Sequence, residues 1–222
     1  LLKGAKYTKA RYMELMALMY DILQKARKEG LMSIEKDVEE PHSSPLFQKY
    51  PTVGSDHHVS EFITDYLRMM VSGNLNAHEI ESLMDNEIET HHAEAHAPAA
   101  AIQRLAGALP AFGIVAAVLG VVNTMGSVGQ PPAILGAMIG SALVGTFLGI
   151  LLAYAVVEPL AGLMEQKVDE SSKELQCIKV TLLASMQGYA PQVAVEFGRK
   201  VLYSTERPTF SELESHVKGK RA

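Results

Sequence analysis

The sequence predicts an all-α protein anchored in a membrane by two transmembrane helices. Charged residues make up 20% of the chain, yet none occurs between Leu105 and Val157. A segment with Gly and Pro, 126–132 (GSVGQPP), divides this stretch into apolar runs at 105–125 and 133–157. Because a helix rises about 1.5 Å per residue, each run is long enough to cross a bilayer core of about 30 Å. The flanks contain helical patterns and no βαβ pattern or internal repeat.

The orientation of this predicted hairpin follows from its basic flanks. Arg104 precedes the first run and Lys167 follows the second, while the loop carries no charge. Positively charged flanks tend to stay in the cytoplasm. We therefore expect a periplasmic loop at 126–132, a cytoplasmic helical domain at 1–104, and a cytoplasmic helical extension with a C-terminal tail at 158–222. The alternative is a soluble protein in which both runs form a buried helical hairpin.

The region before the hairpin is predicted to be helical with one irregular stretch. Apolar residues recur at helical spacing over 12–28, and Gly30 ends that helix. An acidic stretch at 33–51 has three prolines and is expected to be partly loop. A second amphipathic helix is expected at 61–71.

A capping pair predicts the start of the helix that leads to the membrane. Asn76 is followed three residues later by Glu79, so both side chains can satisfy the first free N–H groups. The acidic helix that begins there has Pro98 as a candidate kink.

The region after the hairpin is predicted to contain a helix, a short segment and a final helix. The first helix covers 160–185 and is ended by Gly188 and Pro191. The short segment covers 192–202. The last helix begins near Thr209, where Glu212 completes a capping box.

Composition and motifs exclude several classes of function. The formal net charge of −5 argues against a nucleic-acid binder. Cys177 is the single cysteine, so no internal disulfide forms, and its apolar neighbours predict a packing role. No P-loop, nucleophile elbow or dinucleotide fingerprint occurs. We therefore expect no enzymatic activity and no cofactor.

Three histidines before the membrane raise the hypothesis of a metal site. His92 and His96 are one helical turn apart, with His91 and Glu94 nearby. The HExxH order is absent and no cysteine is close. We therefore expect no metal here, and a helix whose charge responds to pH instead.

Small residues recur at a spacing of four in the second run and also cluster in the first. They are Ala137, Ser141, Gly145, Gly149 and Ala153 in the second, and Gly113, Ala116, Ala117 and Gly120 in the first. Small residues let helices approach closely within lipid. Two interpretations stay open: the hairpin packs on itself, or a partner helix or a ring of subunits packs against it.

Two prolines and a threonine interrupt the apolar zone: Pro110, Pro159 and Thr146. A proline frees a carbonyl and permits a kink. A threonine in such a helix most often bonds back to its own helix, and the alternative is an ion contact. Because neither run contains a carboxylate, a partner must supply any group that titrates during proton transport.

Two blocks of opposite charge flank Gly30. Lys25, Arg27 and Lys28 precede it, and Glu35, Asp37, Glu39 and Glu40 follow it. Such blocks are usually a solvated face, and the alternative is electrostatic docking of a charged partner.

Four distinctive strings occur in the sequence: LPAFGIVAAVLGVV (109–122), VGTFLGILLAY (144–154), KVTLLASMQGYAP (179–191) and AVEFGRKVLYSTERPTF (194–210). These strings resemble the MotA/PomA family of flagellar motor stator subunits, within the MotA/TolQ/ExbB proton channel superfamily. The resemblance covers essentially all of residues 1–222. In that family two further membrane helices precede this segment, and the chain opens without Met or a signal peptide. We therefore expect it to be a segment of a longer protein.

The resemblance implies a stator subunit of the bacterial flagellar motor. Such a subunit crosses the lipid bilayer of the bacterial cell inner membrane several times. Subunits of this type form a homo-oligomeric ring, expected to be a pentamer, around a dimer of a MotB-like subunit. The single membrane helix of that partner carries a proton-accepting Asp. Ion passage then moves the ring, which pushes on the rotor protein FliG.

The resemblance also implies roles for individual residues. The rotor-contact charges fall on Arg27 and Glu35, and the proton-path or conformational residues fall on Pro110, Pro159, Thr146 and Ala117. A threonine that is typical of sodium-driven members is replaced here by Ala117. Because a methyl group offers no ligand oxygen to sodium, this difference favours protons.

Two alternative functions stay open. One is an ExbB/TolQ-type transducer that couples the proton motive force to work at the outer membrane. The other is a membrane-anchored helical scaffold without an ion role. The ERPTF string and the acidic insert before the hairpin favour the stator.

Overall fold

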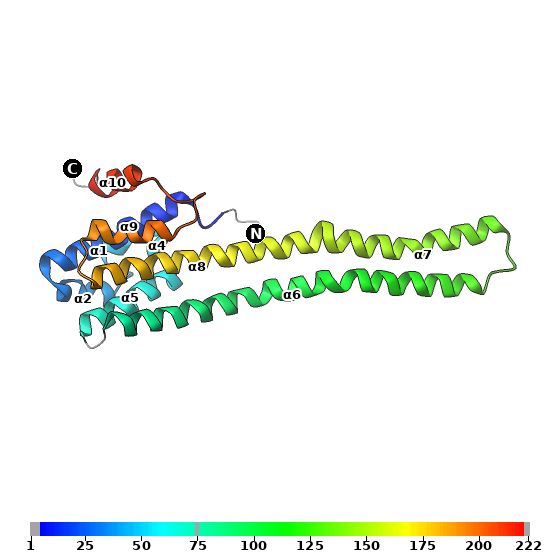
Figure 1. Cartoon of the computed structure of the whole chain (residues 1–222), viewed down its shortest axis with the longest axis horizontal. Coiled ribbons are helices and arrows are strands. Elements are labelled where there is room, and N and C mark those ends of the chain that lie inside the picture. The colour runs from blue at the N-terminus through cyan, green and yellow to red at the C-terminus, as the bar shows by residue number, and fades with distance from the viewer. Residues whose placement is uncertain (1–4, 74–75, 220–222) are drawn as a thin grey trace. The chain divides into compact units, whose positions relative to one another are not determined.

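The computed structural model describes residues 5–73 and 76–219, and the elements in these ranges are helices (Figure 1). The all-α prediction is confirmed. The chain divides into two compact units, one of residues 1–92 with 169–222 and one of residues 93–168. We call the first the lobe and the second the hairpin unit, and we describe each by itself.

The lobe begins with a long helix followed by several short ones. The predicted helix at 12–28 is confirmed as α1 (Lys9–Glu29), and Gly30 ends it with a φ of 90°. The predicted loop at 33–51 is more ordered than expected. It contains η1 (Leu31–Ile34), α2 (Glu35–Glu39), α3 (Pro45–Gln48) and α4 (Pro51–Gly54). The prolines explain part of this difference, because Pro45 and Pro51 each occupy a first helical turn, where proline is favoured.

Two longer helices follow along the chain. α5 (His57–Ser72) begins earlier than predicted and ends at Gly73 in the left-handed conformation. α6 (Ala77–Met125) is capped as predicted: the Asn76 side chain accepts hydrogen bonds from the N–H groups of residues 78 and 79, and the Asn76 N–H donates to Glu79 at 2.9 Å. The helix continues through Pro98 and Pro110.

The C-terminal helices also follow the sequence closely. α8 (Glu158–Met186) gives way to α9 (Pro191–Val201) and α10 (Phe210–Gly219). The capping box at the start of α10 is confirmed, since the Thr209 N–H donates to Glu212 at 2.7 Å. A hydrogen bond from Lys9 and these capping bonds lower the pKa of Glu212 to about 2. α10 is thereby tied to the start of α1.

The core of the lobe surrounds α1, which packs against α9, α10 and α4. Its largest fully buried side chains come mainly from α1, the short elements after it and α5: Tyr12, Leu15, Met16, Leu18, Met19, Ile22, Ile34, Phe47, Tyr50, Phe62, Ile63 and Leu67. Cys177 is buried in the same core, and burial raises the pKa of its thiol to about 12. Its predicted packing role is confirmed.

A buried ion-pair network joins α1 to α8. The Arg11 guanidinium donates to Glu174 at 2.6 and 2.9 Å, to Asp56 at 2.6 Å and to the Thr52 carbonyl at 2.8 Å. Arg11 is 3% exposed and Glu174 is 1% exposed. Burial by itself would lower the pKa of Arg11, but the hydrogen bonds to Glu174 and Asp56 raise it. Arg11 therefore stays protonated and joins α1, α8 and the segment that contains Thr52 and Asp56.

The hairpin unit has the exposure expected of helices that face lipid. It contains the end of α6, then α7 (Pro132–Leu152), a π-helix η2 (Ala153–Val157) and the start of α8. The two apolar windows have mean hydropathies of 2.3 and 2.1, and only 11% of each is buried. Phe112, Leu119 and Phe147 are each more than 60% exposed. The alternative prediction, a hairpin buried inside the core of a soluble chain, is wrong.

We expect Glu174→Ala to destabilise the lobe strongly. Removing one partner of a buried ion pair leaves a desolvated charge and typically costs about 3–5 kcal/mol. For a chain of this size that corresponds to a fall in melting temperature of about 6–20 °C, measured on detergent-solubilised protein.

The matched control is Glu39→Ala, which removes the exposed 3.2 Å ion pair with Arg68. Exposed pairs contribute about 0–1 kcal/mol, so this variant stays close to wild type. Equal melting temperatures for the two variants would contradict the structural role of the Arg11 network.

Candidate functional site

The candidate site lies where α6 and α7 approach each other through glycines. A Cβ at Gly149 would lie 2.7 Å from the Leu109 carbonyl oxygen, and one at Gly113 would lie 2.7 Å from the Gly145 carbonyl oxygen. Real Cβ atoms do not come so close to backbone, so only glycine fits these positions. The prediction that the hairpin packs on itself is confirmed here.

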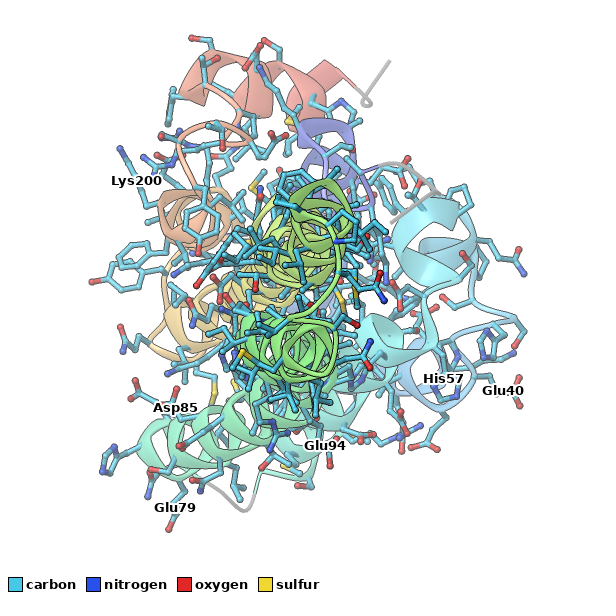
Figure 2. The ribbon with its side chains drawn as sticks, turned by 90° about the vertical axis from the view of Figure 1, so that its right-hand side faces the viewer. Glu40, His57, Glu79, Asp85, Glu94 and Lys200 are labelled. Atoms are coloured by element: carbon cyan, nitrogen blue, oxygen red, sulfur yellow. The ribbon has the colours of Figure 1, made fainter. Side chains whose placement is uncertain are left out.

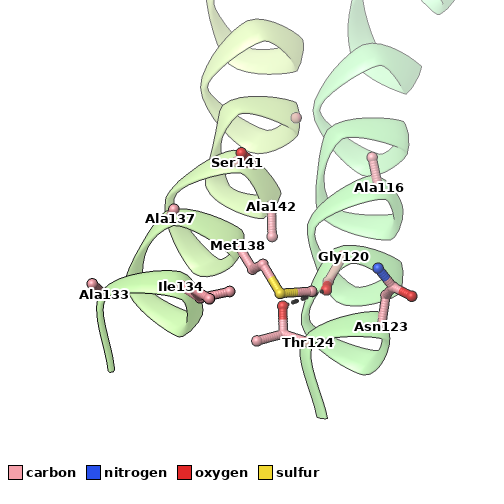
Figure 3. A pocket seen from close by; sticks show the side chains of 11 residues that line it. Ala116, Gly120, Asn123, Thr124, Ala133, Ile134, Ala137, Met138, Ser141 and Ala142 are labelled. Carbon is pink, nitrogen blue, oxygen red and sulfur yellow. Dashed lines mark hydrogen bonds between the residues drawn. The ribbon is translucent and has the colours of Figure 1, made fainter. Parts of the chain in front are cut away.

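Nearer the N-terminus of α7, the same row of small residues does not pack against α6. Ala137 and Ser141 are exposed and line a cavity of about 650 Å³ between α7 and α6, together with Gly120, Asn123 and Thr124 from α6 (Figure 3). Thr124 satisfies its hydroxyl within α6 by donating to the Gly120 carbonyl at 2.9 Å. Gly145 and Gly149 of the small-residue row therefore pack against α6, whereas Ala137 and Ser141 face a cavity with polar groups on its wall.

Thr146 bonds across the hairpin and not to its own helix. Its hydroxyl donates to the Gly113 carbonyl on α6 at 3.3 Å. The predicted bond within its own helix is therefore wrong, because Gly113 has no side chain and its carbonyl comes within reach of α7. Ala117 is buried one turn further along α6, and its N–H nitrogen lies 3.6 Å from where a Cβ on Gly145 would be. Thr146 therefore contacts α6 at Gly113, one helical turn from Ala117.

Pro159 follows a local change of helix type that the sequence did not predict. In η2, the Glu158 N–H donates to the Ala153 carbonyl, five residues earlier, where an α-helix would use a separation of four. Pro159 has no N–H and cannot bond the Ala155 carbonyl in the α pattern. The proline was the available signal, but proline predicts a disturbance without specifying its form. Pro110 instead lies within the continuous α6, next to the Leu109 carbonyl that Gly149 approaches.

The two charge blocks of the lobe divide into internal pairs and free charges. Lys25 pairs with the buried Asp37 at 2.7 Å, and Asp37 also accepts from Ser44 at 2.7 Å. Arg27, in the last turn of α1, and Glu35, the first residue of α2, are exposed. Within residues 5–73 and 76–219 neither forms an ion pair or a side-chain hydrogen bond. These two charges are therefore available to a partner.

Other charged side chains also cover the outside of the lobe. Glu79 and Asp85 on α6 and Lys200 on α9 point outward from the ribbon (Figure 2). Exposure alone therefore does not distinguish Arg27 and Glu35. Lack of a partner does not distinguish them either, because Lys28 and Lys36 are also exposed and form no ion pair among the described residues. The family resemblance is what singles out Arg27 and Glu35.

The three juxtamembrane histidines do not converge. His92 shares a 3.0 Å hydrogen bond with Ser172, His96 lies 3.5 Å from Glu165, and the His91 ring packs on His58 with centroids 4.4 Å apart. In the described part of the chain, no group of three or more His, Cys, Asp or Glu residues could hold a metal ion.

We expect Gly149→Ala to force α6 and α7 apart. Its new methyl group would meet backbone that cannot yield, and overpacking of this kind costs about 1–3 kcal/mol. Gly140→Ala is the matched control on the same helix, because nothing lies within 4 Å of a Cβ there. Melting temperatures in detergent should fall for the first variant only. A hairpin that tolerates both substitutions equally would contradict this packing.

Comparisons with known proteins agree with this geometry. A family model described as the MotA/TolQ/ExbB proton channel family matches residues 55–177. The chain is 55% identical to Motility protein A of Escherichia coli (strain K12) over 98% of its own length and 74% of that protein. It is 38% identical to Chemotaxis protein LafT of Vibrio parahaemolyticus over 96% of its length and 75% of that protein.

Solved structures share the fold. A structure of C. jejuni MotAB matches 89% of this chain and 71% of that chain, with a TM-score of 0.73 and 21% identity. The flagellar MotAB stator complex from Bacillus subtilis matches 86% of this chain and 67% of that chain, with a TM-score of 0.67 and 26% identity. On these matches to sequence and fold, the chain belongs to the MotA/TolQ/ExbB proton channel family.

Proposed function

We propose that the chain is a stator subunit of the bacterial flagellar motor, which converts proton flow across the inner membrane into torque. The observation that carries this proposal is the identity of 55% to a protein named Motility protein A over nearly the whole chain. The likeness to MotAB stator complexes supports it. The same identity favours a stator over an ExbB/TolQ-type transducer of the same family. The role requires no catalytic residue and no bound cofactor.

The proposed membrane segment is the hairpin at 105–157, with the loop 126–132 on the periplasmic side. The regions 1–104 and 158–222 are then cytoplasmic. Support comes from the exposed apolar side chains of both helices and from the absence of charge between Leu105 and Val157. Helices satisfy their own backbone hydrogen bonds, which lipid requires, and the basic residues lie outside the two runs.

The proposed partner is a dimer of a MotB-like subunit surrounded by a ring of five copies of this chain. The two apolar runs have no carboxylate, so the proton-accepting Asp has to come from the partner. A charge in hydrocarbon is costly unless protein or water shelters it. The cavity beside Ser141 and Thr124 has polar groups and small residues, which suit a helix that brings such a charge.

The proposed coupling uses changes in helix shape. One proton that crosses 100 mV releases about 2.3 kcal/mol, which is several times RT and enough to bias two conformations. Pro159 and the π-helix before it, together with Pro110, provide places where α7, α8 and α6 change shape. Thr146 bonds across this region to Gly113, and Ala117 offers no oxygen to sodium. Arg27 and Glu35 then act on the rotor protein FliG.

A complementation experiment tests the proposed function. A bacterium that lacks its motility protein A should assemble flagella that do not rotate, and the gene for this subunit should restore swimming. Swimming speed should follow the proton gradient and should not change when sodium is replaced by potassium. Rotation in the strain without the gene would contradict the stator role, and a sodium requirement would contradict the role of Ala117.

We expect Arg27→Glu to lower the torque at stall severalfold, because it introduces repulsion at the rotor contact. Arg27→Ala should have a smaller effect, since one exposed pair contributes about 0–1 kcal/mol. Lys28→Glu, the same charge change at the next residue, is the matched control. An opposite charge reversal on the rotor should restore part of the torque. If no reversal restores any, the electrostatic account of Arg27 is wrong.

A further inference from the structure

A cavity of about 470 Å³ opens in the lobe beside Arg27. Three of its lining residues belong to the core of the lobe, namely Leu23, Ile34 and Leu67, and each is no more than 3% exposed. They come from α1, η1 and α5. The floor of the cavity is therefore apolar and is built by three different elements.

The exposed side chains that line this cavity are two apolar residues and one cation. Leu31 is 43% exposed and Tyr189 is 46% exposed, and both line the opening. Arg27 also lines it. Exposed aliphatic and aromatic side chains around a concave apolar floor, with an arginine at the edge, have the composition of an interface core.

Two helix ends hold the cavity open. α1 stops at Gly30 with a φ of 90°, and α8 is followed by Gly188 with a φ of 87°. Residues other than glycine rarely adopt this backbone conformation. The chain turns there, so that Leu31 and Tyr189 each follow the turn directly and reach the rim. Neither helix continues across the opening to fill it.

The unpaired charge at the rim indicates what the occupant carries. Lys25, two residues before Arg27 on α1, is neutralised by Asp37. Arg27 has no acidic partner among the residues that the structure describes. A guanidinium at the edge of an apolar cavity is complementary to a carboxylate that lies next to a large apolar side chain.

We propose that the rotor protein inserts one large apolar side chain into this cavity, while a carboxylate of the same segment pairs with Arg27. This inference rests on the proposed function and names the chemistry of the rotor segment. An exposed ion pair alone is weak. An apolar anchor beside it excludes water and makes the contact strong enough to transmit force.

The test compares two adjacent substitutions, Leu31→Asp and Met32→Asp. Both residues are exposed and lie on η1, but only Leu31 lines the cavity, and Met32 is 64% exposed. We expect Leu31→Asp to weaken binding of the purified rotor protein to the solubilised stator complex at least fivefold and to lower stall torque. Met32→Asp should stay within twofold of wild type in both measurements. Fluorescently labelled stators report that each variant assembles in the membrane.

Two further measurements separate the anchor from a general surface effect. Arg27→Ala should reduce rotor binding by a smaller factor in the Leu31→Asp background than in wild type, because the two contacts act together. A thiol at position 31, introduced by Leu31→Cys and labelled with a photoreactive maleimide, should form a crosslink to the rotor protein on irradiation. The native Cys177 is buried and does not compete.

The outcomes distinguish this inference from the proposed function. Equal binding and torque for the Leu31 and Met32 variants would overturn the inference and leave the stator role intact. A position-31 crosslink to a second copy of this chain would overturn it too, because the cavity would then belong to the ring. Failure of the wild-type gene to restore rotation would overturn the proposed function and this inference with it.

Discussion

Contact of backbone with backbone between α6 and α7 is the constraint on which the hairpin unit depends. Lipid provides no hydrophobic drive for helices to associate, so close packing must provide the attraction. Gly113, Gly145 and Gly149 allow it, since a Cβ at any of them would meet the other helix at less than 3.0 Å. The cross-helix bond from Thr146 forms only because this approach is so close. A residue proposed for the ion path is thereby held in place by the glycines around it.

The lobe is stabilised by ion pairs, and some of its charged side chains form such pairs while others stay exposed. The Arg11 network is buried and joins α1 to α8, and Lys25 pairs with Asp37 within the fold. Arg27 and Glu35 stay outside these pairs. Structural ion pairs and available charges therefore occur on the same two helices, α1 and α2, and the proposed rotor contact uses only available charges.

The proposed function requires rigid helices that change shape at defined places. α6 and α8 are long and regular, whereas η2 is a π-helix directly before Pro159. Single π-helical turns within α-helices, known as π-bulges, occur often at functional sites. We propose that this segment, with Pro110, converts neutralisation of a partner carboxylate into motion. The apolar cavity beside Arg27 gives that motion a firm contact, because a buried side chain resists displacement better than an exposed ion pair.

Local patterns in the sequence predicted the long helices and the two apolar runs. Gaps in charge, spacing of apolar residues, the Asn76 and Thr209 caps and Gly30 are local signals, so they placed the long helices, the apolar runs and most helix ends. The strings of the MotA/PomA family then identified the family. Tertiary packing determines which groups meet: the partner of Thr146, the pairing of Lys25 with Asp37, the divergence of the histidines and the cavity beside Arg27. These depend on distances between elements far apart in the chain, which no local pattern encodes.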